Sequence, residues 1–169
     1  GADRLGGNMS VTCQVFGKIA GQFGSERAKA MKAFPQIEAA ETRAKEQLRA
    51  YMTGYAANWD DLLDALQRES DRALLIVREE KGLLDYQSFL RKLHQEIERG
   101  CTPAAAKQWL QVRNLAETGE MIAAAALERR ESRGSHYRAD YPNMDPKLGK
   151  MLLIQKAGER EISCHWAAS

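Results

Sequence analysis

Apolar residues recur at spacings of three and four along most of the chain, a period that indicates helices. Residues 11–23 carry the first stripe, and it predicts a helix that runs from the end of a glycine-rich loop at residues 1–10 to about Lys29. The Phe34-Pro35 pair breaks this pattern, because the residue before a proline disfavours the helical conformation. A charged segment from about Ile37 to Met52 predicts the second helix.

Three more stripes follow, and their short connections predict an antiparallel three-helix bundle over residues 58–131. Asn58 and the Thr102-Pro103 pair are helix-start signals, and Gly100 is typical of the residue after a helix. The apolar positions expected in the bundle core are Leu62, Leu63, Leu66, Ala73, Leu74 and Val77, then Leu83, Tyr86, Leu90, Leu93 and Ile97, then Trp109, Val112, Leu115, Gly119, Ile122 and Ala126.

The predicted fold class is therefore all-α: an antiparallel three-helix bundle preceded by one or two additional helices and followed by a short irregular tail. Strand pairs with turn chemistry are missing before residue 140, and only residues 150–154 resemble a short strand. The 169 residues are enough for one domain with its own core, and abundant Ala, Leu, Glu, Arg and Lys favour helices over sheets.

The charge balance and the cysteines argue against several classes of protein function but exclude few of them. The 25 basic and 23 acidic side chains give a net charge of +2, which does not require a nucleic acid or an anionic membrane. We expect no metal site, because the three cysteines are scattered, and their odd number favours a reducing compartment. The N-terminus carries no signal-peptide pattern, and no apolar run approaches the ~20 residues of a membrane span.

Two segments carry candidate chemistry. The opening Gly1-Ala2-Asp3-Arg4-Leu5-Gly6-Gly7-Asn8-Met9-Ser10 leads into a helix N-terminus. Free amides and the positive end of the dipole suit an anion or an electron-rich carbonyl there, and an arginine adds a fork of donors for a carboxylate. The spacing matches neither a P-loop nor a dinucleotide fingerprint.

The second segment is Glu131-Ser132-Arg133-Gly134-Ser135-His136-Tyr137-Arg138-Ala139-Asp140-Tyr141-Pro142, at the end of the third bundle helix. Gly134 suits the position after a helix, and His136 has a side chain that titrates near neutrality. Arginines beside tyrosines could bind RNA or phosphate. The alternative is a docking segment, held to a neighbouring surface by ion pairs of Glu131 and Asp140.

Together these segments resemble the succinate dehydrogenase/fumarate reductase flavoprotein family, which includes L-aspartate oxidase. The opening segment, with Val15-Phe16-Gly17 and Ala20-Gly21 after it, is similar to the family's last flavin-binding helix. The Glu131 to Pro142 segment is similar to the end of the family's C-terminal helical domain. Asp3 stands where the family has asparagine, and Met9-Ser10 stands where it has Ser-Leu, but flavin contacts through the backbone need not be lost by these changes. The family's usual Met-Trp before the first Val-x-Arg of the bundle is replaced by Leu75-Ile76-Val77-Arg78, which leaves the family branch open.

The resemblance implies roles for particular residues. Arg4 would bind a carboxylate of a C4 dicarboxylate substrate, and Met9 and Ser10 would offer backbone amides to the ring of FAD. Such amides would stabilise the negative charge that develops on a reduced flavin. Glu131, Arg133, His136 and Arg138 would dock the helical domain against the flavin domain.

The resemblance also implies a larger protein, because neither a dinucleotide-binding glycine motif nor a capping domain with a proton-delivering arginine occurs in these residues. We therefore expect a C-terminal fragment of an FAD-dependent oxidoreductase that is inactive alone. Residues 1–30 would end the FAD-binding domain, 31–57 would connect, 58–142 would form the bundle with its docking segment, and 143–169 would be the tail.

Expected partners are the parent's flavin and capping domains and, in some branches, an iron–sulfur subunit, with a cytoplasmic location that can be peripheral to a membrane. Dehydrogenase, reductase and oxidase branches, and covalent or non-covalent FAD, stay open. One alternative function is a free-standing helical protein-interaction module. Another is a nucleic-acid binder that uses Arg129 to Arg138, against which the balanced charge argues.

Overall fold

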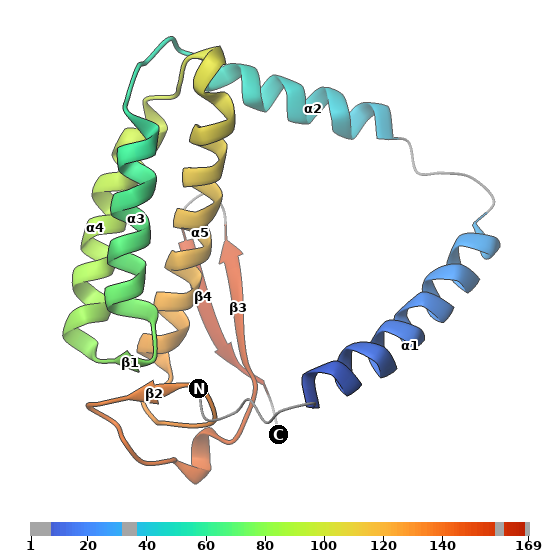
Figure 1. The fold of residues 1–169 in the computed structure, drawn as a ribbon, viewed down its shortest axis with the longest axis vertical. Coiled ribbons are helices and arrows are strands. Elements are labelled where there is room, and N and C mark those ends of the chain that lie inside the picture. The colour runs from blue at the N-terminus through green and yellow to red at the C-terminus, as the bar shows by residue number, and fades with distance from the viewer. Residues whose placement is uncertain (1–7, 32–36, 158–160, 168–169) are drawn as a thin grey trace. The chain divides into compact units, whose positions relative to one another are not determined.

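The computed structural model describes residues 8–31, 37–157 and 161–167 (Figure 1). Two compact units make up the chain, one of residues 1–49 and one of residues 50–169. The opening loop with Arg4, and the Phe34-Pro35 break, lie outside the described residues.

The first unit holds helix α1 (Asn8–Ala30) and most of helix α2 (Ile37–Ala50). Every α1 side chain from Ser10 to Ala30 is exposed, including the apolar stripe, in which Phe16 and Phe23 are 64% and 69% exposed. A β-carbon added at Gly17 or Gly21 would meet no atom within 4 Å, so α1 also offers a smooth side to a partner. An apolar helix face of this kind is a surface that associates with another protein surface.

We expect the isolated 169-residue chain to self-associate through the apolar stripe of α1. Replacing Phe16 and Phe23 together by Glu should raise the dissociation constant of the dimer at least tenfold, because burying two phenyl rings supplies several kcal/mol. Sedimentation over a range of concentrations measures this. The control is Ala28→Glu, which adds a charge on the opposite side of the helix. If the wild-type chain were a monomer at every concentration tested, the prediction would be contradicted.

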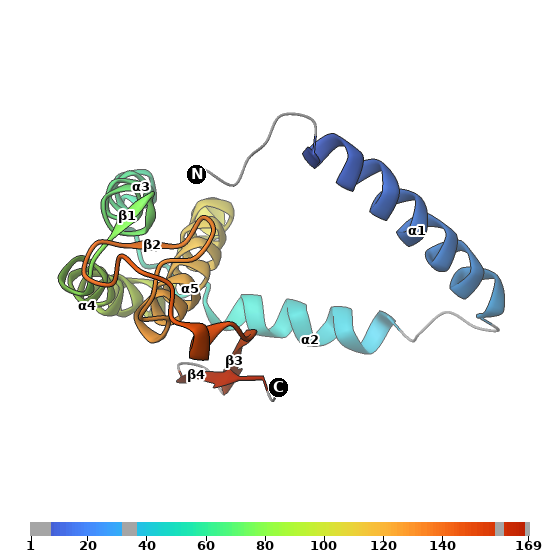
Figure 2. The same ribbon diagram turned by 90° about the horizontal axis from the view of Figure 1, so that it is seen from below.

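The second unit is an antiparallel bundle of α3 (Trp59–Leu74), α4 (Glu80–Glu98) and α5 (Ala106–Glu128), which Figure 2 shows end on. A single 3-10 turn, η1 (Pro103–Ala105), leads into α5. The all-α class and the three-helix bundle predicted from the pattern are confirmed. The starts are confirmed as well: the Asn58 side chain accepts from the amide of Asp61 at 3.3 Å, and that of Thr102 from the amide of Ala105 at 3.3 Å.

Core positions match the predicted stripes fully on α4 and partly on α5. All five predicted α4 residues are buried: Leu83, Tyr86, Leu90, Leu93 and Ile97. On α5 the prediction was wrong for Leu115 and Ile122, which are each 42% exposed, whereas Ala116 and Ala123 are fully buried. Small residues line this face of α5 because α3 and α4 approach it closely. A β-carbon at Gly119 would lie only 2.2 Å from the Tyr86 hydroxyl oxygen.

Gly100, which follows α4, packs against the segment that follows α2. Its φ of +81° confirms the predicted position after a helix, and a β-carbon there would lie 2.3 Å from the Tyr51 carbonyl oxygen. The next amide, that of Cys101, donates to the same Tyr51 carbonyl at 2.7 Å. This contact fixes Tyr51 beside the bundle, where its ring lies 4.8 Å from that of Trp109.

Short strands complete the second unit. Strand β1 (Val77–Arg78) pairs in parallel with β2 (Tyr137–Arg138), so α3 ends at Leu74 and Val77 is not the core residue predicted from the stripe but is 60% exposed. The tail that was expected to be irregular contains the 3-10 turn η2 (Pro146–Leu148) and an antiparallel hairpin of β3 (Leu152–Ala157) and β4 (Glu161–Trp166).

The hairpin lies along α5 (Figure 1) and is anchored by one aromatic residue. Trp166 donates its indole N–H to Glu128 at 3.0 Å, and the guanidinium of Arg129 lies 4.7 Å from the centre of its ring. These contacts give the tail a tertiary partner, which the local sequence does not encode.

Candidate functional site: the loop after α5 and the start of α1

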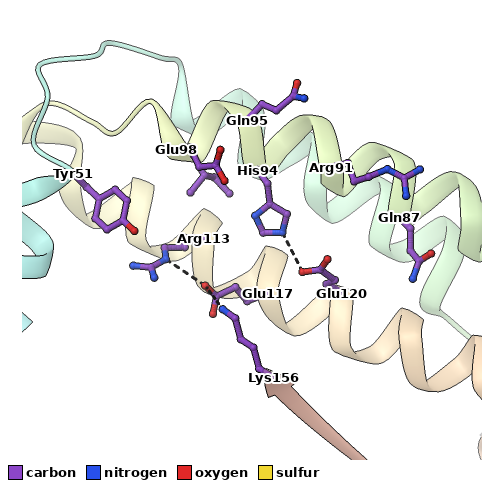
Figure 3. A pocket seen from close by; sticks show the side chains of 11 residues that line it. Tyr51, Gln87, Arg91, His94, Gln95, Glu98, Arg113, Glu117, Glu120 and Lys156 are labelled. Atoms are coloured by element: carbon purple, nitrogen blue, oxygen red, sulfur yellow. Dashed lines mark ion pairs between the residues drawn. The ribbon is translucent and has the colours of Figure 1, made fainter. Parts of the chain in front are cut away.

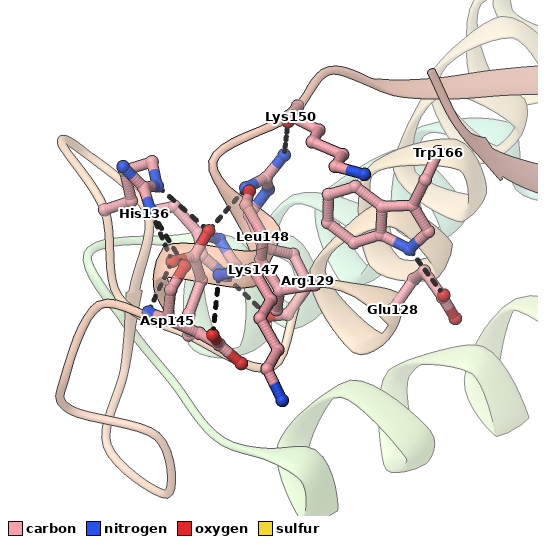
Figure 4. A network of polar contacts seen from close by, with 10 residues as sticks. Glu128, Arg129, His136, Asp145, Lys147, Leu148, Lys150 and Trp166 are labelled. Atoms are coloured by element: carbon pink, nitrogen blue, oxygen red, sulfur yellow. Dashed lines mark hydrogen bonds and ion pairs between the residues drawn. The ribbon is translucent and has the colours of Figure 1, made fainter. Parts of the chain in front are cut away.

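Glu131 is the centre of the loop that follows α5. Its carboxylate is fully buried and accepts from the Arg129 guanidinium at 2.5 Å and from Arg133 Nε and Nη2, each at 3.0 Å. The backbone amide of Asp145, a residue labelled in Figure 4, donates to this carboxylate at 2.9 Å. The hydrogen bond from Arg133 is the main cause that lowers the pKa of Glu131 to about 2, against the opposing effect of burial.

A second ion pair closes the other side of the loop. The Arg138 side chain is 1% exposed and binds Asp140 in a bidentate way, with Nε to Oδ1 at 2.8 Å and Nη2 to Oδ2 at 2.6 Å. Its Nη1 donates to the carbonyl of Ala126 in the last turn of α5. Asp140 also accepts from the amide of Glu80 at 3.0 Å, which places a carboxylate at the start of α4.

His136 lies half-buried between two arginines. The Arg78 guanidinium can only donate, so His136 Nδ1 accepts from it at 3.5 Å, and Nε2–H donates to the Arg129 carbonyl at 3.0 Å. This arrangement requires the neutral imidazole with the proton on Nε2. Burial lowers the pKa of His136, and the nearby arginines lower it further, which agrees with the neutral form.

Ser132 joins the two ion pairs. Its hydroxyl accepts from the amide of Arg138 at 2.9 Å and donates to the carbonyl of Tyr141 at 2.8 Å. The structure therefore brings all four residues predicted to dock, Glu131, Arg133, His136 and Arg138, into one loop. Their ion pairs lie within this loop, however, and not across to a neighbouring surface.

Sequence reasoning missed two members of this loop. Arg78 reaches it only through the β1–β2 pairing, which no local pattern announces. Asp145 could have been found, because Asp-Pro is a helix-start signal and the Asp145 side chain does accept from the amide of Lys147 at 2.8 Å. Gly134 has the expected positive φ of +59°, but α5 already ends at Glu128, so Gly134 turns the loop and does not follow the helix.

The depressed pKa of Glu131 predicts a loss of stability in acid. Because its folded-state pKa of about 2 lies below its usual value, its contribution is complete above about pH 5 and is lost as the pH falls towards 2. We expect Glu131→Gln to reduce the acid-induced fall in unfolding free energy by about 2 kcal/mol. This is about half of the free energy that the pKa shift of Glu131 corresponds to, because Arg133 is partly exposed and water weakens the pair. Urea titrations between pH 6 and pH 2.5 measure it; parallel curves for both proteins would contradict it.

The start of α1, in the first unit, is a second candidate site. Asn8 begins the helix, Met9 and Ser10 lie in its first turn, and that turn contains no acidic residue. The amides of a first turn have no acceptor within the helix, so an electron-rich oxygen can bind there without a competing carboxylate.

Comparison with known proteins covers both the loop after α5 and the start of α1. The family model described as fumarate reductase flavoprotein C-term matches residues 63–166, which include the whole loop after α5. The chain belongs to this family. It is also similar to a chain of the fumarate reductase (CoM/CoB) of Methanothermobacter marburgensis, with 30% identity over 96% of this chain and 30% of the relative. It is similar to L-aspartate oxidase of Pseudomonas aeruginosa, with 29% identity over 91% of this chain and 28% of the relative.

A solved structure extends the likeness to three dimensions. The Mycobacterium smegmatis Sdh1 complex in the apo form matches with a TM-score of 0.81 and 27% identity, over 97% of this chain and 30% of that one. The family resemblance predicted from the two motifs is thereby confirmed, and the chain spans about 30% of the length of the first of these relatives.

Two further properties hold for the residues that the structure describes. No helix among them combines the length and the hydropathy that crossing a lipid bilayer demands. Nor do His, Cys, Asp and Glu side chains gather there in a group of three or more that could hold a metal ion.

Proposed function

We propose that this chain is the C-terminal part of an FAD-dependent oxidoreductase acting on C4 dicarboxylates of the succinate/fumarate type, and that it is inactive alone. The observation that carries the proposal is the family match over residues 63–166, since relatives of that family include fumarate reductases and L-aspartate oxidases. The residues present contain one edge of such a site, not a complete one.

In this proposal the start of α1 supports the cofactor. FAD supplies the hydride-transfer chemistry when it is bound in the longer protein. The amides of Met9 and Ser10 hold the negative side of the flavin ring, and the Arg4 guanidinium clamps a substrate carboxylate. The exposed apolar stripe of α1 then packs inside the flavin domain.

The loop after α5 has a positioning role in this proposal. Glu131 and Arg138 are buried, so they shape the loop, and the loop's exposed side chains meet the flavin domain. Tyr137, which is 41% exposed, and the half-buried Arg133 and His136 lie on that outer side. Arg129 and Arg133 are already engaged with Glu131, and Arg138 with Asp140, so these three guanidinium groups are not free to bind a nucleic-acid backbone.

Partner subunits belong to the same proposal. The similar Sdh1 protein was solved as a complex, and we propose that the longer protein likewise works with further subunits, among them an iron–sulfur protein. A location at the inner face of a membrane, reached through those subunits and not by a spanning helix of the described residues, follows from it.

Two measurements test the proposed function. The reading frame upstream of Gly1 should continue for several hundred codons and encode a dinucleotide-binding glycine motif. The purified longer protein should carry FAD, and its flavin absorbance should bleach with succinate or, once reduced, recover with fumarate. A start codon at Gly1, or a flavin that responds to neither compound, would overturn the proposal.

A further inference from the structure

A polar cavity of about 460 Å³ lies between α4 and α5, and its lining residues belong neither to the loop after α5 nor to α1. Tyr51 and Arg113 line one end of it, and Gln87 and Arg91 line the other (Figure 3). The side chain of Lys156, from strand β3, extends towards Glu117 on α5. The family match and the proposed function assign no role to these side chains.

The cavity carries equal numbers of permanent charges of each sign. Its carboxylates are Glu98, Glu117 and Glu120, and its permanent cations are Arg91, Arg113 and Lys156, with His94 beside them. The charges are also arranged across the groove. At one end the α4 wall presents Arg91 and His94 and the α5 wall presents Glu120 (Figure 3). A ligand that spans this end therefore meets a donor wall and an acceptor wall.

The lining groups hold hydrogen-bonding capacity that the protein itself does not use. Glu117 is shared by Arg113 at 3.3 Å and Lys156 at 3.1 Å. Among the residues that the structure describes, the one charged partner of Glu120 is His94, at 3.3 Å. That last contact is an ion-pair distance without hydrogen-bond geometry, so the buried His94 Nε2 has no hydrogen-bond partner. Pairs in the loop after α5 are much tighter, at 2.5–2.6 Å for Arg129–Glu131 and Arg138–Asp140.

Arg91 is the matching donor with spare capacity. Its guanidinium donates to the Ser88 hydroxyl at 2.7 Å, and within the described part of the chain no carboxylate lies at ion-pair distance from it. Arg113, by contrast, is fixed over aromatic rings, 5.2 Å from the centre of Tyr51 and 5.5 Å from that of Trp109. The end of the cavity with Arg91, His94 and Glu120 is thus the end built to accept a further polar group.

We propose that this cavity binds a small zwitterion, a free amino acid or a dipeptide, with its carboxylate on Arg91 and His94 and its ammonium group on Glu120. Only a ligand with both charges compensates both walls, since a dicarboxylate would place a negative group against Glu120 and a diamine a positive one against Arg91. The volume admits an amino acid with a side chain or a dipeptide. This site is independent of the proposed function.

Ligand-observed NMR on the 169-residue chain tests the proposal. The probes are pools of the twenty proteinogenic amino acids, alanylalanine, and succinate as a dicarboxylate, followed by calorimetric titration of the amino acid that gives the strongest signal. We expect an amino acid or alanylalanine to bind, and its N-acetylated and C-amidated forms to bind at least tenfold more weakly.

Two variants and two matched controls locate the site. Arg91→Gln and Glu120→Gln should each weaken binding about tenfold, because each removes one charged hydrogen bond. Lys92→Gln on α4 and Asp64→Asn on α3 remove equal charges outside the cavity and should leave the affinity unchanged. Circular dichroism and the melting temperature confirm that each variant is folded.

The proposal is overturned by any of four results: no amino acid or dipeptide binds, capped and free forms bind equally, succinate alone binds, or neither Arg91→Gln nor Glu120→Gln weakens binding. Since these measurements use neither flavin nor turnover, their failure leaves the proposed function untouched, and a failure of the proposed function leaves them standing.

Discussion

Arg4→Ala in the longer protein should lower kcat/KM for succinate or fumarate about 100-fold while the protein keeps its flavin. A guanidinium that holds a carboxylate through paired charged hydrogen bonds contributes about 3 kcal/mol, which corresponds to that factor. The flavin should remain bound because its proposed contacts in this chain are the amides of Met9 and Ser10, which the substitution does not touch. Steady-state assays over a range of substrate concentrations, with the flavin absorbance as a check, measure the effect.

The matched control is Arg27→Ala, which removes an exposed arginine from the last turn of α1. It should leave kcat/KM within about twofold of the wild-type value. Near-normal turnover of Arg4→Ala at low substrate concentration would show that Arg4 does not bind the substrate. That result would leave the proposed flavin contacts of α1 unaffected.

Glu131→Ala should lower the unfolding free energy of the 169-residue chain by about 3 kcal/mol, with a fall of about 10 °C in Tm. The substitution leaves Arg129 and Arg133 beside each other without a shared anion, and it strands the Asp145 amide that Glu131 accepts from at 2.9 Å. The loss is at the lower end for a buried ion pair because Arg133 is 38% exposed and water can solvate it.

Glu69→Ala provides the comparison for Glu131→Ala. Glu69 pairs with Arg72 at 2.6 Å, but both side chains are accessible to water, so its removal should cost no more than about 0.5 kcal/mol. Urea denaturation monitored by circular dichroism gives both values. Equal losses for the two variants would mean that Glu131 is an ordinary surface carboxylate and that the loop after α5 is held by other contacts.

The bundle was predictable from the sequence because long apolar side chains recur regularly on α4 and helix-start signals stand at Asn58 and Thr102. The error on α5 has a physical cause. Alanine is neutral in a hydrophobicity pattern, so Leu115 and Ile122 looked like core, whereas close helix packing selects Ala116 and Ala123. Backbone approach, and not side-chain hydrophobicity, determines which face of α5 is buried.

The loop after α5 was predictable in its membership but not in its geometry. The spacing of Glu131, Arg133, His136 and Arg138 marked a dense polar segment, and its docking against a flavin domain stays a prediction. The sequence did not show that Arg138 folds back onto Ala126 and Asp140, or that Arg78 reaches the loop through β1. Such contacts depend on tertiary pairing and on Trp166 holding the hairpin against α5, neither of which a local pattern encodes.

A crystal structure of the longer protein with FAD tests most directly whether α1 and the bundle complete a flavin domain. We predict that the backbone nitrogens of Met9 and Ser10 lie about 3 Å from the pyrimidine edge of the flavin ring, with the α1 stripe buried. A flavin bound away from the start of α1, or an α1 still exposed to solvent in that structure, would contradict the account.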